Sequence, residues 1–169
     1  MNDVDTQPLW HAMNNQRYDA DRLLLEFGIA SIPINVFEIA RKLEVHVHLV
    51  RNAHWNGAVD SSSGKAHIWV DADQTHTQQR FTAAHEIGHL LLHEPGRVFR
   101  DTWSSSKVDI AEIQANNFAT NFLMPSWLVI PNVIPGSSRI ADLAKTFAVS
   151  PQAMKHRLEN LGFNIDEQR

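Results

Sequence analysis

The sequence contains no cysteine. This absence excludes disulfide bonds, thiolate metal sites and cysteine nucleophiles together. A transition-metal site in this chain therefore has to use imidazole and carboxylate ligands. The sequence offers both, because its 169 residues include 10 histidines and 19 aspartates and glutamates.

Excess positive charge and long hydrophobic runs are lacking as well. Lys and Arg number 15 against 19 acidic residues, and the formal net charge of -4 argues against a broadly basic nucleic-acid binder. No apolar run reaches about 18 residues, which excludes a transmembrane helix. The N-terminus shows neither the basic region nor the apolar region of a signal peptide. We therefore expect a cytoplasmic protein without membrane association.

Hydrophobic periodicity predicts an α+β fold, because helical spacing and strand-like alternation of apolar residues both occur. Helices are predicted at 14–27, 36–43, 75–93, 108–123, 140–147 and 151–161, and strands at 45–49, 58–59 and 65–70. The strands are expected to form one small antiparallel sheet. The proline-rich stretch 125–136 predicts a boundary near residue 130, with a helical segment at 131–169 packed on residues 1–130.

The most informative motif lies in the helix predicted at 75–93. His85 and His89 are four residues apart, so they share a helix face, about 6 Å of rise apart, and can reach one ion. Glu86 follows the first histidine and points toward the adjoining face, where it can accept a proton from water. This spacing is the H-E-x-x-H motif of zinc metallopeptidases, here in the required setting of a helix that follows a strand.

A catalytic zinc ion needs a third protein ligand and an open position for water. His93 continues the four-residue spacing, but it lies about 12 Å along an unbroken helix from His85. Two nitrogens that bind the same zinc ion are only about 3–3.5 Å apart. We therefore expect His93 to support the ligands from a second shell, or to pack at the helix end, rather than to bind the metal.

A carboxylate on the helix predicted at 108–123 is the better third ligand. Spacing favours Glu112, because its longer side chain can bridge two packed helices, and it leaves Asp109, one turn earlier, as a competitor. Asn116 lies one turn after Glu112 on the same face, where it could orient a ligand from the second shell.

The runs RFTAAHEIGHLLLH, EIQANNFATNFLMP and LAKTFAVSPQAMKHRLENLG closely resemble the ImmA/IrrE family of metallopeptidases. The resemblance covers roughly residues 30–162. It implies a zincin-like core, here assigned to residues 1–130, and a helix-turn-helix-like segment at 131–169. In that family the leading glutamate of the second run completes the zinc site, a role that maps onto Glu112. Longer relatives carry a C-terminal sensor-like domain, which this chain is expected to lack.

The resemblance also implies a function. Family members act on helix-turn-helix repressors of the Xre type, and cleavage relieves repression of mobile-element or stress-response genes. Zn2+ bound by His85, His89 and Glu112, with Glu86 as general base, would supply the peptidase chemistry. The alternative is a non-proteolytic repressor-binding protein, of the anti-repressor or toxin–antitoxin type, with a structural zinc site.

Three further patterns bear on function. The C-terminal helices have helix-turn-helix spacing, but their basic cluster at 155–157 is small, so direct DNA binding is unlikely. His46 and His48 share the polar face of a predicted strand, where they either bind a metal or simply face solvent. The strand at 65–70 could bind an extended substrate by β-augmentation, or could be an ordinary strand of the sheet.

Overall fold

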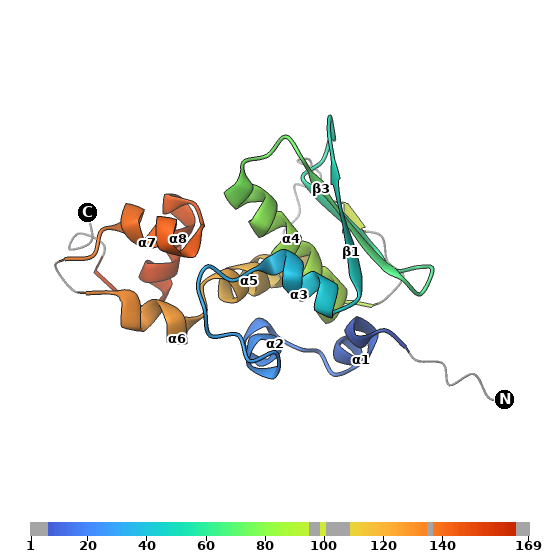
Figure 1. Ribbon diagram of the computed structural model, residues 1–169, viewed down its shortest axis with the longest axis horizontal. Helices are drawn as coiled ribbons and strands as arrows, with labels where there is room; N and C mark the ends of the chain where they lie inside the picture. Colours follow the sequence, from blue (N-terminus) through green and yellow to red (C-terminus); the bar gives the residue numbers. More distant parts are fainter. Residues whose placement is uncertain (1–6, 95–98, 101–108, 135–136, 165–169) are drawn as a thin grey trace.

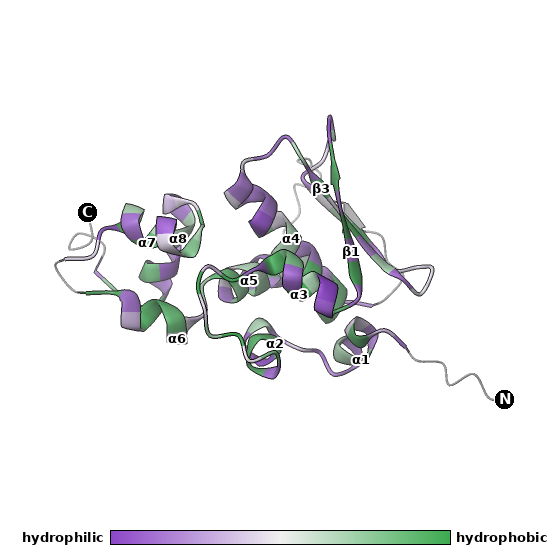
Figure 2. Ribbon diagram, viewed as in Figure 1, coloured by the Kyte–Doolittle hydropathy of each residue, from purple (hydrophilic) through white to green (hydrophobic). Residues whose placement is uncertain are grey.

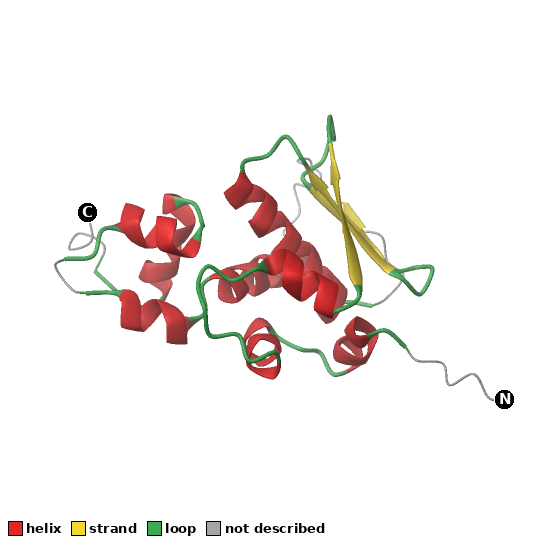
Figure 3. Ribbon diagram, viewed as in Figure 1, coloured by secondary structure: helices red, strands yellow, loops and turns green. Residues whose placement is uncertain are grey.

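The computed structural model describes residues 7–94, 99–100, 109–134 and 137–164, and it confirms the α+β fold (Figures 1 and 3). The N-terminal elements are α1 (Leu9–Asn15), α2 (Ala20–Glu26), α3 (Val36–Lys42), β1 (Val45–Val50), β2 (Gly57–Asp60) and β3 (Ala66–Asp71). They are followed by α4 (His76–Leu92), β4 (Phe99–Arg100), α5 (Ile110–Leu123), α6 (Ser126–Val129), the 3-10 turn η1 (Ile130–Asn132), α7 (Ile140–Phe147) and α8 (Pro151–Asn160). Among the described residues, no helix combines the length and apolar character needed to cross a bilayer.

The single helix predicted at 14–27 is wrong, because two short helices occupy this region. Arg17 adopts a left-handed backbone conformation with φ of 50°, and Asp19 then caps α2 by accepting a hydrogen bond from the Arg22 amide. The first helix also begins earlier than expected, since α1 buries Trp10 completely. Burial of one large aromatic residue outweighed the polar character of its neighbours.

The sheet is mixed rather than antiparallel, with strand order β1-β3-β2-β4. β1 and β3 are parallel neighbours, whereas β2 pairs antiparallel with both β3 and β4. The turn after β1 carries the chain past β3 to its far side, and the β2–β3 hairpin then places β3 in the centre. The suggestion that the strand at 65–70 binds an extended substrate by β-augmentation is therefore wrong, because β1 and β2 already pair with both edges of β3.

One face of the sheet packs on α4. The inward side chains of β3, from Ala66, Ile68 and Val70, are fully buried, while those of His67 and Trp69 point outward. In Figure 1 the sheet lies on one side of α4, and α6, α7 and α8 gather toward the other end of the molecule. Figure 2 shows that α4 is hydrophilic at its start and becomes more apolar along its length, where it enters the core.

Both ends of α4 are held by side chains. Thr75 and Gln78 form a reciprocal capping box at the N-terminus. At the other end, the buried Asn14 side chain donates hydrogen bonds to the carbonyls of Leu90 at 2.7 Å and His93 at 2.6 Å. The helix that carries the H-E-x-x-H motif is thus fixed at both termini.

Two buried arginines join the C-terminal helices to α4 and α5. Arg80 of α4 donates to the carbonyls of Ala148 at 3.1 Å and Phe147 at 3.4 Å, at the end of α7. Arg157 of α8 donates to the Met124 carbonyl at 2.8 Å, at the end of α5. Each guanidinium meets carbonyls that a helix C-terminus leaves without intrahelical partners. Burial lowers the pKa of both groups, and nearby Asp21 partly opposes this change at Arg157.

Candidate metal centre

His85, His89 and Glu112 converge at the contact between α4 and α5. The Nε2 atoms of the two histidines are 3.0 Å apart. One carboxylate oxygen of Glu112 lies 3.2 Å from Nε2 of His85, and the other lies 3.2 Å from Nε2 of His89. These three side chains are the group of ligand-type residues, within the described part of the chain, whose ligand atoms all lie within 4.8 Å of one another.

The donor set fits a divalent transition metal. Its separations of 3.0–3.2 Å match the spacing of about 3–3.5 Å between ligand atoms that share one ion with bonds of about 2.0–2.1 Å. Both histidines are almost completely buried, whereas the side chain of Glu112 is 31% exposed. The site is therefore buried on the α4 side, and its carboxylate on α5 is partly accessible to solvent.

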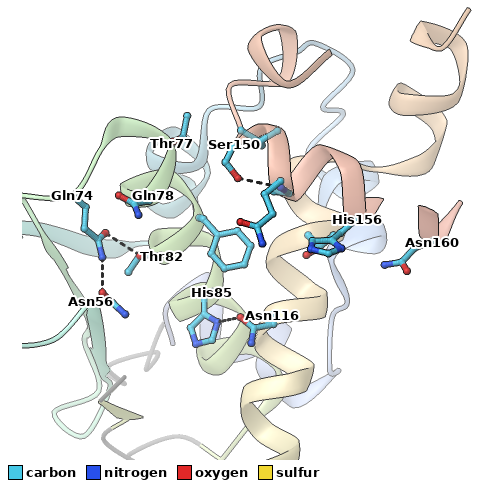
Figure 4. A pocket seen from close by; sticks show the side chains of 15 residues that line it. Asn56, Gln74, Thr77, Gln78, Thr82, His85, Asn116, Ser150, His156 and Asn160 are labelled. Atoms are coloured by element: carbon cyan, nitrogen blue, oxygen red, sulfur yellow. Dashed lines mark hydrogen bonds between the residues drawn. The ribbon is translucent and has the colours of Figure 1, made fainter. Parts of the chain in front are cut away.

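The side chain of Asn116 orients His85. Its Oδ1 lies 3.0 Å from Nδ1 of His85, so Nδ1 donates the hydrogen and Nε2 keeps its lone pair toward the site (Figure 4). Asp109, the competing carboxylate, caps α5 by accepting a hydrogen bond from the Ala111 amide at 2.9 Å. Asp109 thus lies at the N-terminal end of α5, whereas Glu112 lies beside the two histidines.

His93 lies beside the centre but outside the three-residue group. It is the C-cap residue of α4, and its ring centroid is 5.3 Å from that of His89. The extended backbone of His93, with φ of -116° and ψ of 170°, ends α4 before this residue could join the His85, His89 and Glu112 group. Its ring packs against that of a ligand-type histidine.

Glu86 is buried, with 1% of its surface exposed, and it faces β2. The close neighbour is Gly57, the first residue of β2, which the sequence analysis did not single out. A Cβ atom at Gly57 would lie 2.6 Å from Oε1 of Glu86 and 2.5 Å from Cγ2 of Thr82. Real Cβ atoms do not approach other atoms so closely, so this position needs a glycine if Glu86 is to keep its place.

Gly88, on the opposite side of α4, also allows a close approach of a neighbouring element. A Cβ there would lie 3.0–3.1 Å from the side chain of Phe118 on α5. The absence of a side chain lets α4 and α5 approach closely enough for Glu112 to reach both histidines. The glycine within the H-E-x-x-H sequence is thus a packing residue.

A cleft of about 460 Å³ leads to His85 from the space between α4 and α8 (Figure 4). Six amide side chains line it, from Asn56, Gln74, Gln78, Asn116, Gln152 and Asn160, together with hydroxyl groups and a few apolar side chains. Among its lining residues only His85 and His156 are ionisable. The cleft is built from distant parts of the chain, so no local sequence pattern predicted it.

Hydrogen bonds order the wall of the cleft beside Glu86. The Thr82 hydroxyl donates to Oε1 of Gln74 at 3.1 Å, and Nε2 of Gln74 donates to Oδ1 of Asn56 at 3.0 Å (Figure 4). This chain links α4 to the residue that precedes Gly57. It fixes the wall of the cleft and the neighbourhood of Glu86 together.

A protein-family comparison matches residues 40–159 to Peptidase_M78, described as the IrrE N-terminal-like domain. The chain belongs to this family. The matched residues contain the whole His85, His89 and Glu112 group, together with Glu86 and every described residue of the cleft except Asn160. The family membership confirms the resemblance seen in the sequence and supports a metallopeptidase-like site.

Two curated proteins that resemble this chain come from Bacillus subtilis and from a Bacillus phage. Immunity region protein 2 of Bacillus phage phi105 is 28% identical over 98 residues, which cover 56% of this chain and 61% of the relative. YqaB of Bacillus subtilis is 31% identical over 98 residues, covering 57% of this chain and 55% of the relative. The matched region thus spans little more than half the length of either relative.

A solved structure shares the fold. A Mycobacterium tuberculosis transcriptional regulator superposes with a TM-score of 0.56 at 18% identity, covering 88% of this chain and 46% of the regulator. At this identity the likeness concerns the fold alone.

Proposed function

We propose that the chain is a cytoplasmic zinc endopeptidase that cleaves a helix-turn-helix repressor of the Xre type, and so relieves repression of mobile-element or stress-response genes. The observation that carries the proposal is the convergence of His85 and His89 of α4 with Glu112 of α5, because α4 also holds the buried Glu86. The family supports the peptidase chemistry, and the name of the phage relative, an immunity region protein, supports a regulatory target.

Zinc is the proposed metal because two imidazoles and one carboxylate form a ligand set that catalytic zinc sites use. When bound, the ion supplies Lewis acidity that polarises a peptide carbonyl and lowers the pKa of water. The side chains of His85, His89 and Glu112 would hold the ion, and Asn116 would keep His85 in the tautomer that binds it.

Glu86 is proposed as the general base. Peptide hydrolysis joins a water oxygen to the carbonyl carbon and breaks the bond from that carbon to the amide nitrogen. The Glu86 carboxylate would take a proton from the water and deliver it to the leaving nitrogen, so that it ends the cycle ionised as it began. Its confinement by Gly57 and Thr82 leaves little freedom of orientation, which favours this transfer.

The cleft between α4 and α8 is proposed to hold the substrate. Amide side chains both donate and accept hydrogen bonds, which suits the alternating N–H and C=O groups of an extended peptide backbone. Because the described residues that line the cleft include no carboxylate, lysine or arginine, the cleft suits an uncharged segment of the repressor. The α8 side chains Gln152, His156 and Asn160 form the wall opposite Gln78, so the C-terminal helices would take part in substrate binding.

The proposal is tested with the purified chain and an Xre-type repressor encoded beside its gene. We expect a single cut in the repressor, which a chelator abolishes and added Zn2+ restores. Glu86→Gln should abolish cleavage while leaving metal binding intact, and Glu94→Gln, at an exposed glutamate beyond the end of α4, should leave cleavage unchanged. A stable uncut complex that Glu86→Gln does not alter would contradict the proposal and favour a non-proteolytic anti-repressor or toxin–antitoxin role.

A further inference from the structure

The outer face of the sheet carries a second cluster of histidines, made of His46 and His48 on β1 and His67 on β3. The register places His46 opposite His67, and His48 opposite Trp69. The ring of His67 stacks against both others, with centroids 5.1 Å from His46 and 5.3 Å from His48. We call His46, His48 and His67 the outer histidine cluster. The polar strand face recognised in the sequence thus gains a third imidazole from a neighbouring strand.

The spacing within the cluster is that of a metal-binding pair. Nε2 of His48 and Nδ1 of His67 are 3.0 Å apart, the same separation as between the Nε2 atoms of His85 and His89. Two imidazole nitrogens at this distance either share a proton or bind one ion, since nitrogens on one zinc ion are about 3–3.5 Å apart. His46 is exposed and can bring its ring to the same point by rotation about its side-chain bonds.

An acidic side chain on β2 lies beside the outer histidine cluster. Asp60 on β2 lies opposite His67 and, because the Ser62 amide donates to its carboxylate, its pKa is lowered and it is ionised at neutral pH. The outer histidine cluster thus has an acidic side chain from a third strand beside it, which favours a bound cation.

We propose that His46, His48 and His67 form a second transition-metal site on the outer face of the sheet, for an ion that prefers imidazole ligands, such as Zn2+ or Cu2+. The site is independent of the proposed peptidase centre, because it uses the opposite face of the sheet from α4 and shares no residue with the His85, His89 and Glu112 group. Water would complete the coordination, since His46 and His48 are exposed.

Metal stoichiometry of the full chain tests the proposal. The metal-free protein is titrated with Zn2+ by calorimetry, and we expect two ions to bind. His48→Ala and His67→Gln should each weaken one of the two binding events by roughly tenfold or more. His89→Ala should weaken only the other event. His54→Ala, at an exposed histidine outside both clusters, should change neither.

Trp69 provides a local readout that does not depend on peptidase activity. Its ring centroid is 5.6 Å from that of His48 and 5.8 Å from that of His67. In a His89→Ala background, added Cu2+ should therefore quench tryptophan fluorescence, and Trp69→Phe or His67→Gln should remove most of the quenching. Circular dichroism of each variant verifies that the fold is retained.

The outcomes separate this proposal from the proposed function. Loss of a binding event in His48→Ala and His67→Gln supports the outer site even if no repressor is ever cut. A single bound ion that His89→Ala removes, with unchanged binding in His48→Ala and His67→Gln, would overturn the outer site and leave the peptidase proposal standing. Quenching by Cu2+ that persists unchanged in both Trp69→Phe and His67→Gln would also overturn it.

Discussion

The molecule holds two pairs of imidazoles at the same separation and in opposite settings. His85 and His89 lie on one buried helix, with their Nε2 atoms 3.0 Å apart, and His48 and His67 lie on neighbouring strands at the surface, also 3.0 Å apart. The first pair has a carboxylate in contact with both rings, whereas the second has the rings of His46 and Trp69 within stacking distance. The two pairs of imidazole nitrogens are therefore equally spaced, but their surroundings preorganise them for metal binding to different degrees.

The two pairs differ in the groups that surround the imidazoles, not in the spacing of the imidazoles themselves. The buried pair needs no rearrangement, because α4 is capped at both ends and Asn116 fixes the ring of His85. The outer cluster must turn the ring of His46 and lose the stacking of His67. We therefore expect the buried centre to bind zinc more tightly than the outer face, although each offers three side-chain ligands.

Removal of the Glu112 carboxylate, which lies beside both histidines of the buried pair, should have the largest effect on the difference in zinc affinity between the two pairs. Glu112→Gln keeps the size of the side chain but loses the anionic oxygens that lie 3.2 Å from each histidine. We expect zinc affinity at the buried centre to fall by more than about 100-fold, beyond the 10–100-fold loss that removal of a ligand's hydrogen-bond partner gives. Competition against a chelator of known affinity measures the change.

Asp109→Asn is the matched control for Glu112→Gln. Asp109 lies on the same helix, but its carboxylate caps α5 rather than facing the histidines. Because Asn is also a good N-cap residue, the control should retain both stability and zinc affinity. Equal losses of zinc affinity in the two variants would contradict the assignment of Glu112 as the third ligand.

A methyl group at Gly57 should separate the metal centre from its proposed base. In Gly57→Ala the new Cβ would displace Glu86 and Thr82, at a cost of about 1–3 kcal/mol in the free energy of unfolding. A displacement of about 1 Å at a catalytic group lowers turnover by about 100-fold. We expect repressor cleavage to fall accordingly while both zinc-binding events persist, as measured by a cleavage assay and calorimetry.

Thr82→Ser provides the control for Gly57→Ala. It removes Cγ2, one of the two atoms that the new Cβ would meet, and keeps the hydroxyl that donates to Gln74. The double variant Gly57→Ala/Thr82→Ser should regain part of the melting temperature without regaining cleavage, because the contact with Glu86 remains. Full recovery of cleavage would show that Glu86 had not been displaced.

The sequence predicted the parts of this molecule that depend on neighbours along the chain. The four-residue spacing on α4 was enough to place His85 and His89 on one face. Spacing favoured Glu112 over Asp109 without deciding between them. The decision needed the approach of α4 to α5, which depends on the packing of Gly88 against Phe118.

Features that depend on distant pairing could not be predicted. Strand order places β3 between β1 and β2, and only this register brings His67 beside His46 and His48. The role of Gly57 could not be predicted either, because nothing in the local sequence shows that Glu86 lies against its backbone. Trp10 began a helix in a polar region for the same reason, since its burial depends on the assembled core.

The smallest effect is expected where a single hydrogen bond distinguishes the two imidazole pairs. Asn116→Ala removes the acceptor 3.0 Å from Nδ1 of His85, so the ring can change tautomer and rotate. We expect zinc affinity at the buried centre to fall by about 10-fold, at the low end of the range for such partners because Asn116 is exposed to water that can replace it. Asn117→Ala, at an exposed neighbour, is the control and should leave the affinity unchanged. If Asn116→Ala has no effect while Glu112→Gln does, the carboxylate alone accounts for the advantage of the buried pair, and orientation of His85 contributes nothing to it.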